Sequence, residues 1–295
     1  MVRVLLASGA DIPPAHQLDA WHFAWNGRTY RGGFAMIPLG NGKPGLIDAV
    51  PLDAYLYGVV SREISAAWPP AALAAQAILA RTYAMTKLRP DKQYDMVATE
   101  SDQRYGGIES ESVEARAAID ATAGTLVTYR GATARVAYGA CCGGRTADPA
   151  DVWNSSIPYL RSIVDPHCAG SPGYRWETRV ACDSLASLDL ERAGKLRSVE
   201  MLGMTRSGRP RQLAFSGSAS TIEVGTDSFR AAAGMSVVRS TYLRSVAPSG
   251  DDLEIAGNGS GHGVGMCQWG ARAMAAAGAT AAEIIAFYFP TTKIA

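Results

Sequence analysis

The sequence has no excess of either charge: 28 lysine and arginine residues balance 27 aspartate and glutamate residues, for a formal net charge of +1. Attraction to nucleic acid or to an anionic membrane surface through bulk charge is therefore not expected. No apolar run reaches the roughly 20 residues that a membrane-spanning helix needs, and the start, MVRVLLASGADIPPAH, reads as a first β-strand rather than as a signal peptide. The substrate or binding partner of the protein must therefore be inferred from a local site.

Several catalytic signatures are also missing. No Gly-x-Ser-x-Gly elbow is present, and the cysteines form no Cys–His protease signature, so acyl transfer is not expected. The glycine-rich segment GSGHGVGMCQWGA, residues 259–271, has neither the Lys and Ser/Thr of a phosphate loop nor the spacing of a dinucleotide fingerprint. No nucleotide is therefore expected as a partner. Five cysteines are also too few and too irregularly spaced for a disulfide framework.

The order of strand and helix signals predicts an α+β fold. Residues 2–60 alternate in short runs broken by turns, which is typical of antiparallel strands, and the run PLDAYLYGVV at 51–60 is interpreted as strand-like. We expect one domain, residues 1–295, with a β-rich part to about residue 60, a helical catalytic part at about 61–125 and a mixed C-terminal part. Further expected elements are helices from Pro69 or Pro70 to Lys87, at 113–123, from Gly225 to Gly234 and from Thr280 to Tyr288, and hairpins at 125–138 and 198–215.

One mostly apolar helix carries three polar side chains. In REISAAWPPAALAAQAILARTYAM, residues 62–85, Gln76 and Tyr83 fall on one line of the helical wheel, whereas Arg81 points well away from it. A helix that is apolar on nearly every side is expected to be buried, and a buried amide or guanidinium is costly unless it is paired. These side chains are therefore expected either to form a structural hydrogen-bond network or to reach a cleft.

Glu63 is the candidate acid. It lies between the apolar run 51–60 and Trp68, where apolar walls would raise the pKa of its carboxyl group and keep it protonated near neutral pH. A glutamate at such a boundary also commonly serves as a cap or as a surface charge, and this alternative stays open. His262, in the glycine-rich segment 259–271, is likewise either structural or close to a ligand.

The segment 139–175 has no hydrophobic period and is expected to be an extended loop. Cys142, His167 and Cys168 are its candidate zinc ligands, because thiols and imidazoles are the groups that zinc prefers. Their spacing matches no standard zinc finger, and a fourth ligand is not evident. A disulfide between Cys142 and Cys168, or two free thiols, are the alternatives that stay open.

Taken together, several blocks resemble the stage II sporulation protein D and amidase enhancer family. Those blocks are PLDAYLYGVVSREISAAWPPAALAAQAILARTYA, SDQRYGG, GGRT, SGRPRQLAFSG, FRAAAG and GHGVGMCQWGARAMAAAGATAAEIIAFYFP, in the family's order and from about Pro51 to the end. The chain departs from the family's usual residues at a few positions. These are Asp53 for Glu, Ile64 and Ser65 for Met and Pro, Cys267 for Ser and Trp269 for Tyr.

The resemblance implies an extracytoplasmic lytic transglycosylase, located in the cell wall or periplasm and acting on the glycan strands of peptidoglycan. Its products would carry 1,6-anhydro-MurNAc ends, and the family's catalytic glutamate maps onto Glu63. No cofactor is expected to be required, with a structural zinc as the open alternative. Some members enhance a cell-wall amidase, so the rival hypothesis is a glycan-binding amidase enhancer that does not cut.

The resemblance also supplies candidate sugar contacts. For Arg81 two roles compete, a clamp on the lactyl carboxylate of the sugar and a brace of Glu63. The first is favoured, because an ion pair with Glu63 would lower the pKa of its carboxyl group and spoil it as an acid. Tyr83 and Tyr105 have core packing as an alternative. The candidate substrate-binding residues are Gln76, Arg81, Tyr83, Gln103, Tyr105 and His262.

Overall fold

The computed structural model describes residues 1–40 and 42–295, and the chain divides into two compact units. Unit 1 comprises residues 1–136, 275–286 and 291–295, and unit 2 comprises residues 137–274 and 287–290. Both units combine antiparallel sheets with helices, which confirms the predicted α+β class.

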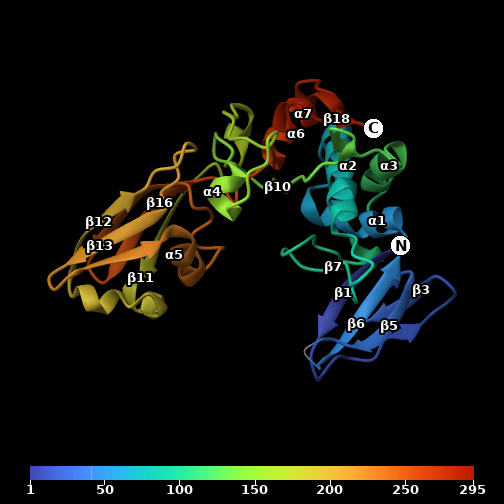
Figure 1. The fold of residues 1–295 in the computed structure, drawn as a ribbon, viewed down its shortest axis with the longest axis horizontal. Coiled ribbons are helices and arrows are strands. Elements are labelled where there is room, and N and C mark those ends of the chain that lie inside the picture. The colour runs from blue at the N-terminus through green and yellow to red at the C-terminus, as the bar shows by residue number, and fades with distance from the viewer. Residues whose placement is uncertain (41) are drawn as a thin grey trace. The chain divides into compact units, whose positions relative to one another are not determined.

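The N-terminal part of unit 1 is built from two small sheets (Figure 1). The first has the order β5-β6-β1-β7, in which β5, β6 and β1 pair antiparallel and β7 pairs parallel to β1. The second is the antiparallel meander β2-β3-β4. The strands are β1 (Val2–Ser8), β2 (His16–Gln17), β3 (His22–Trp25), β4 (Arg28–Arg31), β5 (Gly33–Pro38), β6 (Pro44–Val50) and β7 (Met96–Val97).

Three helices pack with these strands: α1 (Leu52–Glu63), α2 (Pro70–Lys87) and α3 (Val113–Ala121). The strand-like interpretation of residues 51–60 is wrong, because this run forms most of α1. Its buried side chains Tyr55, Leu56, Val59 and Val60 recur at helical spacing and join the apolar core of the unit. The predicted bounds of α2 are confirmed, with a proline at its first position and its end at Lys87.

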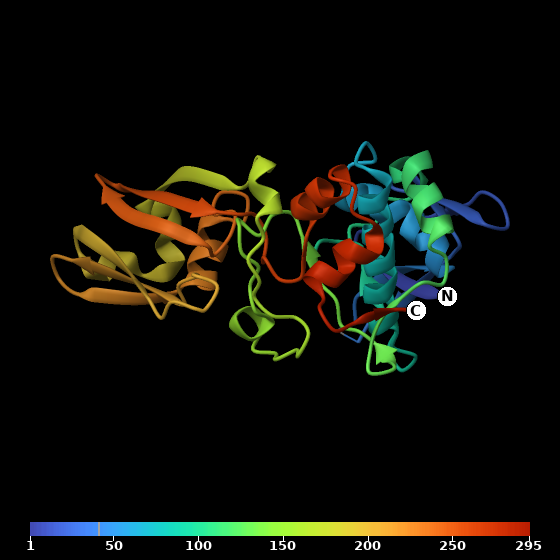
Figure 2. The same ribbon diagram turned by 90° about the horizontal axis from the view of Figure 1, so that it is seen from above.

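The rest of unit 1 joins distant parts of the chain. The hairpin of β8 (Val127–Tyr129) and β9 (Ala132–Thr133) turns at Arg130 and Gly131, which both have positive φ, as predicted. Strand β18 (Lys293–Ile294) pairs antiparallel with β8, so the C-terminal end lies beside this hairpin (Figure 2). A short 3-10 helix, η1 (Ile108–Ser110), connects the loop after β7 to α3.

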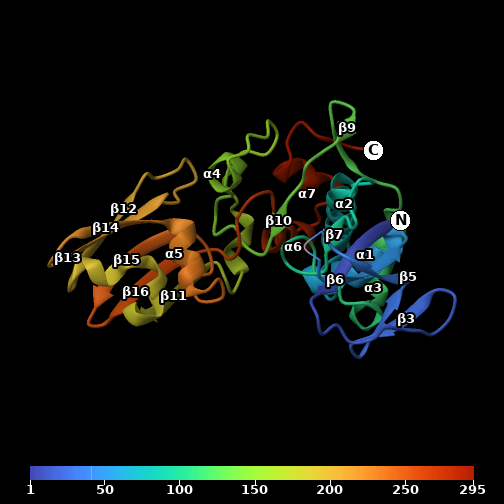
Figure 3. The same ribbon diagram turned by 60° about the horizontal axis from the view of Figure 1, so that its bottom comes forward.

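Unit 2 contains two three-stranded antiparallel sheets, β11-β16-β15 and β12-β13-β14 (Figure 3). Side chains from both sheets and from α5 share one apolar cluster, which includes Trp176, Phe215, Phe229 and Ile255. The predicted hairpin and the helix ending at Gly234 are confirmed. The elements are β11 (Arg175–Ala181), η3 (Cys182–Leu188), η4 (Leu190–Ala193), β12 (Leu196–Leu202), β13 (Gln212–Gly217), β14 (Thr221–Gly225), α5 (Thr226–Ala233), β15 (Leu243–Ser249) and β16 (Asp252–Asn258).

The segment before β11 is mostly irregular, as predicted. It holds β10 (Tyr138–Gly139), which pairs parallel with β17 (Met266–Cys267), the short helix α4 (Pro149–Trp153) and the 3-10 turn η2 (His167–Gly170). The last helices, α6 (Gln268–Ala276) and α7 (Ala281–Tyr288), contribute residues to both units. Within residues 1–40 and 42–295, no helix is both long and apolar enough to cross a bilayer.

Candidate functional site

Glu63 is the last residue of α1 and lies half-buried in unit 1. The apolar residues that precede it, Val59 and Val60, anchor this end of the helix in the core, and Ile64 directly after it is buried as well. The main-chain N–H of Arg104 donates to Glu63 Oε1 at 3.0 Å. A packed helix end and a backbone hydrogen bond therefore fix the position of this carboxyl group.

The surroundings of Glu63 favour the protonated form of its carboxyl group. Burial raises its pKa above the ordinary value, and the nearby charge of Glu100 acts in the same direction. The Arg104 amide and the charges of Arg104 and Arg62 act to lower the pKa, but they do not cancel the effect of burial. The partial negative charge at the C-terminal end of α1 also disfavours an ionised carboxylate.

The loop that carries Arg104 is held by its two neighbours, Gln103 and Tyr105. Gln103 is fully buried, and its Nε2 donates to the carbonyl oxygen of Ala80 in α2 at 3.2 Å. The Tyr105 ring is buried, and its hydroxyl donates to Asp48 Oδ2 in β6 at 2.9 Å. Neither side chain is placed to contact a sugar, which corrects the prediction for both; they hold the loop that presents the Arg104 amide to Glu63.

The same loop is tied to α2 through Asp102. Tyr83 donates its hydroxyl to Asp102 Oδ1 at 2.8 Å, Lys87 Nζ lies 2.8 Å from the same oxygen, and the Val97 N–H donates to Oδ2 at 3.0 Å. Burial acts to raise the pKa of Asp102, but these three donors lower it overall. Tyr83 is half-buried and close enough to Glu63 for the two charges to interact. Its role as a sugar contact stays a prediction.

Arg81 braces three helices and does not reach a groove. Its guanidinium is 2% exposed and donates through Nε to Asp53 Oδ1 in α1 at 2.9 Å and through Nη2 to the carbonyl oxygen of Ile119 in α3 at 3.0 Å. The predicted clamp on a substrate carboxylate is therefore wrong, because the charge is buried and already paired with Asp53. Gln76 is also fully buried, so its prediction as a sugar contact is corrected in the same way.

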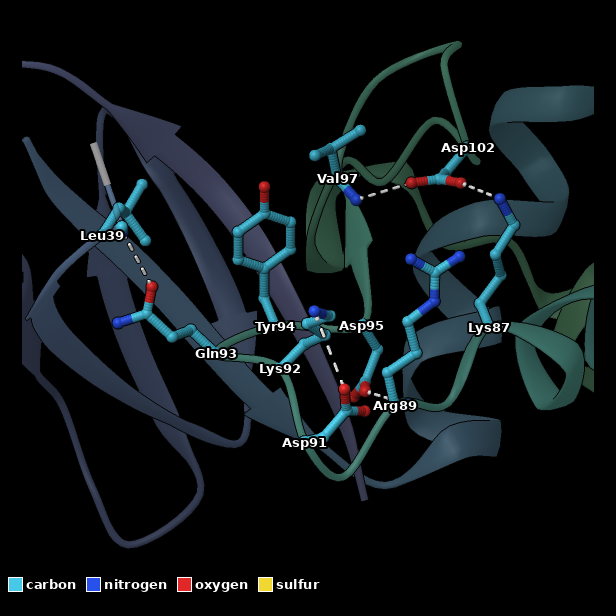
Figure 4. Close-up of a pocket in the computed structure, with 11 residues that line it drawn as sticks. Leu39, Lys87, Arg89, Asp91, Lys92, Gln93, Tyr94, Asp95, Val97 and Asp102 are labelled. Carbon is cyan, nitrogen blue, oxygen red and sulfur yellow. Dashed lines mark hydrogen bonds and ion pairs between the residues drawn. The ribbon is translucent and has the colours of Figure 1, made fainter.

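A pocket of about 520 Å³ opens beside this loop (Figure 4). It is lined mainly by residues 39–40 and 87–102, and Lys87 and Asp102 form part of its wall. Its lining carries three lysine or arginine and three aspartate side chains, so its charge favours neither an anion nor a cation. Asp102 connects the pocket to Tyr83, while Glu63 is held by the next part of the same loop.

His262 belongs to unit 2, where its imidazole is half-buried. Nδ1 accepts a hydrogen bond from the Val264 N–H at 3.0 Å, which leaves Nε2 as the donor to the carbonyl oxygen of Tyr138, also at 3.0 Å. Burial lowers the pKa of His262 to about 4, so the ring is neutral at pH 7. Both ring nitrogens serve the local backbone; the exposed Trp153 lies 5.0 Å from the ring centre, and a sugar contact through these two rings stays a prediction.

The predicted zinc ligands are brought together in part. Cys142 Sγ and Cys168 Sγ lie 3.6 Å apart, both thiols are free, and Asp165 and Cys267 join them in one buried group. His167 is exposed and its ring packs edge-on against Phe287, so its prediction as a ligand is wrong. Hydrogen bonds from the neighbouring thiols lower the pKa of Cys168.

Comparisons with known proteins identify the family. The family model described as stage II sporulation protein matches residues 40–129, which contain Glu63 and the loop that holds it. The chain is 30% identical over 275 residues to an uncharacterized protein of Brachyspira hyodysenteriae, covering 90% of this chain and 72% of that protein. The chain belongs to the stage II sporulation protein D family.

Two relatives in Bacillus subtilis carry functional names. The chain is 28% identical to stage II sporulation protein D, covering 84% of this chain and 75% of that protein. It is 29% identical to an amidase enhancer, covering 81% of this chain but only 40% of that protein. The two relatives thus carry different functional names.

Sequence reasoning missed Asp102, Arg104 and Asp165. Asp102 and Arg104 lie inside the SDQRYGG block, so the block itself was the available signal. Asp165 precedes His167 and Cys168 by only a few residues, but a single aspartate in a long loop is too common to be singled out.

Proposed function

We propose that this member of the stage II sporulation protein D family is a peptidoglycan lytic transglycosylase with Glu63 as its single general acid and base. The proposal rests on the half-buried Glu63 carboxyl group, whose pKa is raised and which accepts a hydrogen bond from the Arg104 backbone amide. A carboxyl group whose pKa is raised and that is fixed in place is suited to proton donation. Because peptidoglycan lies outside the cytoplasmic membrane, the proposal implies an extracytoplasmic location.

The proposed reaction needs one proton carrier. Protonated Glu63 donates its proton to the oxygen that links C1 of MurNAc to GlcNAc while the C1–O bond breaks through an oxocarbenium-like transition state. The Glu63 carboxylate then accepts the proton of the muramic acid 6-hydroxyl as O6 bonds to C1. The products are a free GlcNAc hydroxyl and a 1,6-anhydro-MurNAc end, and Glu63 is again protonated.

The neighbouring carboxylates support a mechanism with one acid. Glycosidases that use water or a covalent intermediate need a second carboxylate at a fixed distance from the first. Here Asp102 is engaged by Tyr83, Lys87 and a backbone N–H, while the Glu100 side chain is 77% exposed. An attacking hydroxyl on the substrate itself removes the need for a second carboxylate and has the rate advantage of an intramolecular reaction.

The second candidate function is a glycan-binding amidase enhancer that does not cut. One relative carries the name amidase enhancer. The burial of Gln76, Arg81, Gln103 and Tyr105 is compatible with it, because these motif residues hold the fold together whether or not Glu63 acts as an acid.

The deciding experiment compares the wild-type protein with Glu63→Gln and Glu100→Gln. Glu100→Gln is the matched control, since it removes a carboxylate that acts on Glu63 but is mostly exposed. Each protein is incubated with glycan strands, intact or stripped of stem peptides by an amidase, and the products are examined by mass spectrometry for 1,6-anhydro-MurNAc ends. Strand binding is measured in parallel by sedimentation.

We expect Glu63→Gln to lower the rate by about 100- to 10,000-fold, the usual contribution of a general acid or base. Strand binding should be unchanged, and Glu100→Gln should stay within a few-fold of wild type. If the wild-type protein binds both kinds of strand but forms no anhydro ends, the transglycosylase proposal fails. Stimulation of a cell-wall amidase by both wild type and Glu63→Gln would then establish the enhancer function.

A further inference from the structure

A buried group of three thiols and one carboxylate lies in unit 2, where the proposed transglycosylase chemistry makes no use of it. The sulfur atoms of Cys142, Cys168 and Cys267 and a carboxylate oxygen of Asp165 all lie within 4.8 Å of one another. We propose that this group is a structural metal site that holds one Zn²⁺ ion through the three thiolates, with Asp165 as the fourth ligand.

The spacing of the ligand atoms suits a tetrahedral ion. With Zn–S bonds of about 2.3 Å, two sulfurs of one tetrahedron lie about 3.8 Å apart. The Cys142 and Cys168 sulfurs are 3.6 Å apart, and the largest separation in the group, 4.8 Å, needs a contraction of only about 1 Å. Four protein ligands that close all positions, most of them thiolates, are typical of structural rather than catalytic zinc.

The atoms around the ligands are also those that a metal site requires. Main-chain N–H groups of Gly144 and Cys142 each donate to a ligand sulfur at 3.2 Å, to Cys168 and Cys267 respectively. The Asp165 carboxylate accepts from the Tyr288 hydroxyl at 2.9 Å and from the His167 N–H at 2.9 Å. Such donors fix the orientation of ligands and stabilise their negative charge.

A positive side chain lies next to the group. Arg209 is 4% exposed, and its Nη2 donates to the carbonyl oxygens of Cys142 and Arg145, each at 3.1 Å. Three thiolates, one carboxylate and one Zn²⁺ ion carry a net charge of −2, which burial would otherwise penalise. The guanidinium offsets part of this charge.

The ligands come from three segments that are far apart in the sequence. Cys142 follows β10, Asp165 and Cys168 flank the start of η2, and Cys267 ends β17. The apolar cluster of unit 2 is formed by residues 176–255, so these segments lie outside it and are joined by backbone pairing, such as that of β10 with β17. One ion would join the irregular segment to β17, across 125 residues of chain.

Cys141 is the competing fourth ligand. It is buried and interacts with the thiols of Cys168 and Cys267, but the group of atoms within 4.8 Å contains Asp165 in its place. Asp165→Asn is therefore expected to weaken metal binding at least 10-fold, and Cys141→Ser less than 3-fold. The reverse order would overturn the assignment of Asp165.

The experiment measures metal in the full chain, purified under reducing conditions without a chelator. Zinc per chain is determined by mass spectrometry of the digested protein for wild type, Cys267→Ser and Cys182→Ser. Cys182→Ser is the matched control, since Cys182 is a free, half-exposed cysteine of the same unit. Cys267→Ser keeps the side-chain size and introduces the residue that is usual in the family. We expect about one zinc per chain in wild type and the control, and at least a five-fold loss in Cys267→Ser.

A second measurement needs no variant, so a folding defect in Cys267→Ser leaves the proposal testable. Wild-type protein stripped of zinc and loaded with Co²⁺ should show the intense d–d absorption of tetrahedral cobalt and a thiolate-to-cobalt charge-transfer band. The proposal is overturned if the wild-type protein holds less than 0.1 metal ion per chain and gives no such spectrum. A disulfide between Cys142 and Cys168, found by peptide mapping of the same preparation, would overturn it as well.

Discussion

The two units bury polar side chains in different ways. In unit 1 the buried Arg81 side chain bonds to Asp53 of α1 and to the Ile119 carbonyl oxygen of α3, and the buried Gln103 side chain bonds to the Ala80 carbonyl oxygen of α2. In unit 2 the thiols of Cys142, Cys168 and Cys267 lie on irregular segments and short strands, and they meet one another and Asp165. The helices of unit 1 thus provide both side-chain and main-chain partners for a buried polar group, whereas the thiols of unit 2 meet other groups that can bind a metal.

The buried polar groups of the two units also have different roles. Gln103 and Tyr105 hold the loop whose Arg104 amide donates to Glu63, and thereby help to fix the Glu63 carboxyl group. The cysteine group holds together a segment that the apolar core does not include.

The largest expected effect is the loss of metal from unit 2. Treating the protein with a chelator should accelerate amide hydrogen exchange at residues 140–147 and 163–168 by about 100-fold or more. The reason is that an ion present at 100 times its dissociation constant stabilises the bound state by about 2.7 kcal/mol. Exchange in α2 should be unchanged, and equal acceleration in both places, or none in either, would contradict the comparison.

The second expected effect concerns Arg81, whose guanidinium links α2 to α1 and α3 in unit 1. Arg81→Met should lower the free energy of unfolding by about 2 kcal/mol, because it leaves the buried carbonyl oxygen of Ile119 without a donor, whereas the Asp53 side chain is 42% exposed and can be solvated. Arg62→Met, at an exposed position on α1, should change it by less than about 0.5 kcal/mol. Urea unfolding measures both. A stable Arg81→Met protein with weakened glycan binding would instead restore the substrate-clamp hypothesis.

A smaller effect is expected from pH. Asp48 in β6 is fully buried, and burial raises its pKa to about 8. Between the unfolded-state pKa near 4 and the folded-state pKa, the folded protein binds more protons, so stability must fall as the pH rises. The slope should be on the order of 1 kcal/mol per pH unit.

Urea unfolding at pH 5, 6 and 7 tests the assignment to Asp48. Asp48→Asn keeps the side-chain shape and removes the titrating group, so the slope should become smaller in the variant. An unchanged slope would mean that another group, such as Glu63, whose pKa is also raised, accounts for it.

Much of the fold could be predicted because its signals are local. Pro69 and Pro70 define the start of α2, positive φ at Arg130 and Gly131 fits the predicted turn, and Thr280 with Glu283 forms the cap of α7. Residues 51–60 are the exception, because tyrosine and valine favour strands, whereas the buried positions of this run repeat at helical spacing. In α1, packing against the core overrides intrinsic propensity.

The site was less predictable because the partners of polar residues are distant. The sequence places Glu63 correctly at the end of an apolar run, but it does not show that Arg81 meets a carbonyl oxygen 38 residues away. The Cys142 and Cys267 pair is separated by 125 residues, and the aspartate beside it carries no motif. Whether a polar residue faces a groove or a buried partner depends on these contacts, which no local pattern encodes.

The smallest expected effect distinguishes two roles of the Tyr83 hydroxyl, a structural hydrogen bond and a contact with the sugar. Tyr83→Phe removes the hydrogen bond to Asp102, whose carboxylate keeps Lys87 and the Val97 N–H as partners. Stability should therefore fall by only about 0.5–1.5 kcal/mol, the usual net contribution of one hydrogen bond. If Tyr83 is purely a brace, strand binding and the rate of anhydro-end formation should stay within two-fold of wild type. A several-fold rise in KM with unchanged stability would show that the half-buried Tyr83 hydroxyl contacts the glycan, and unit 1 would then bind substrate through α2 as well as brace Glu63.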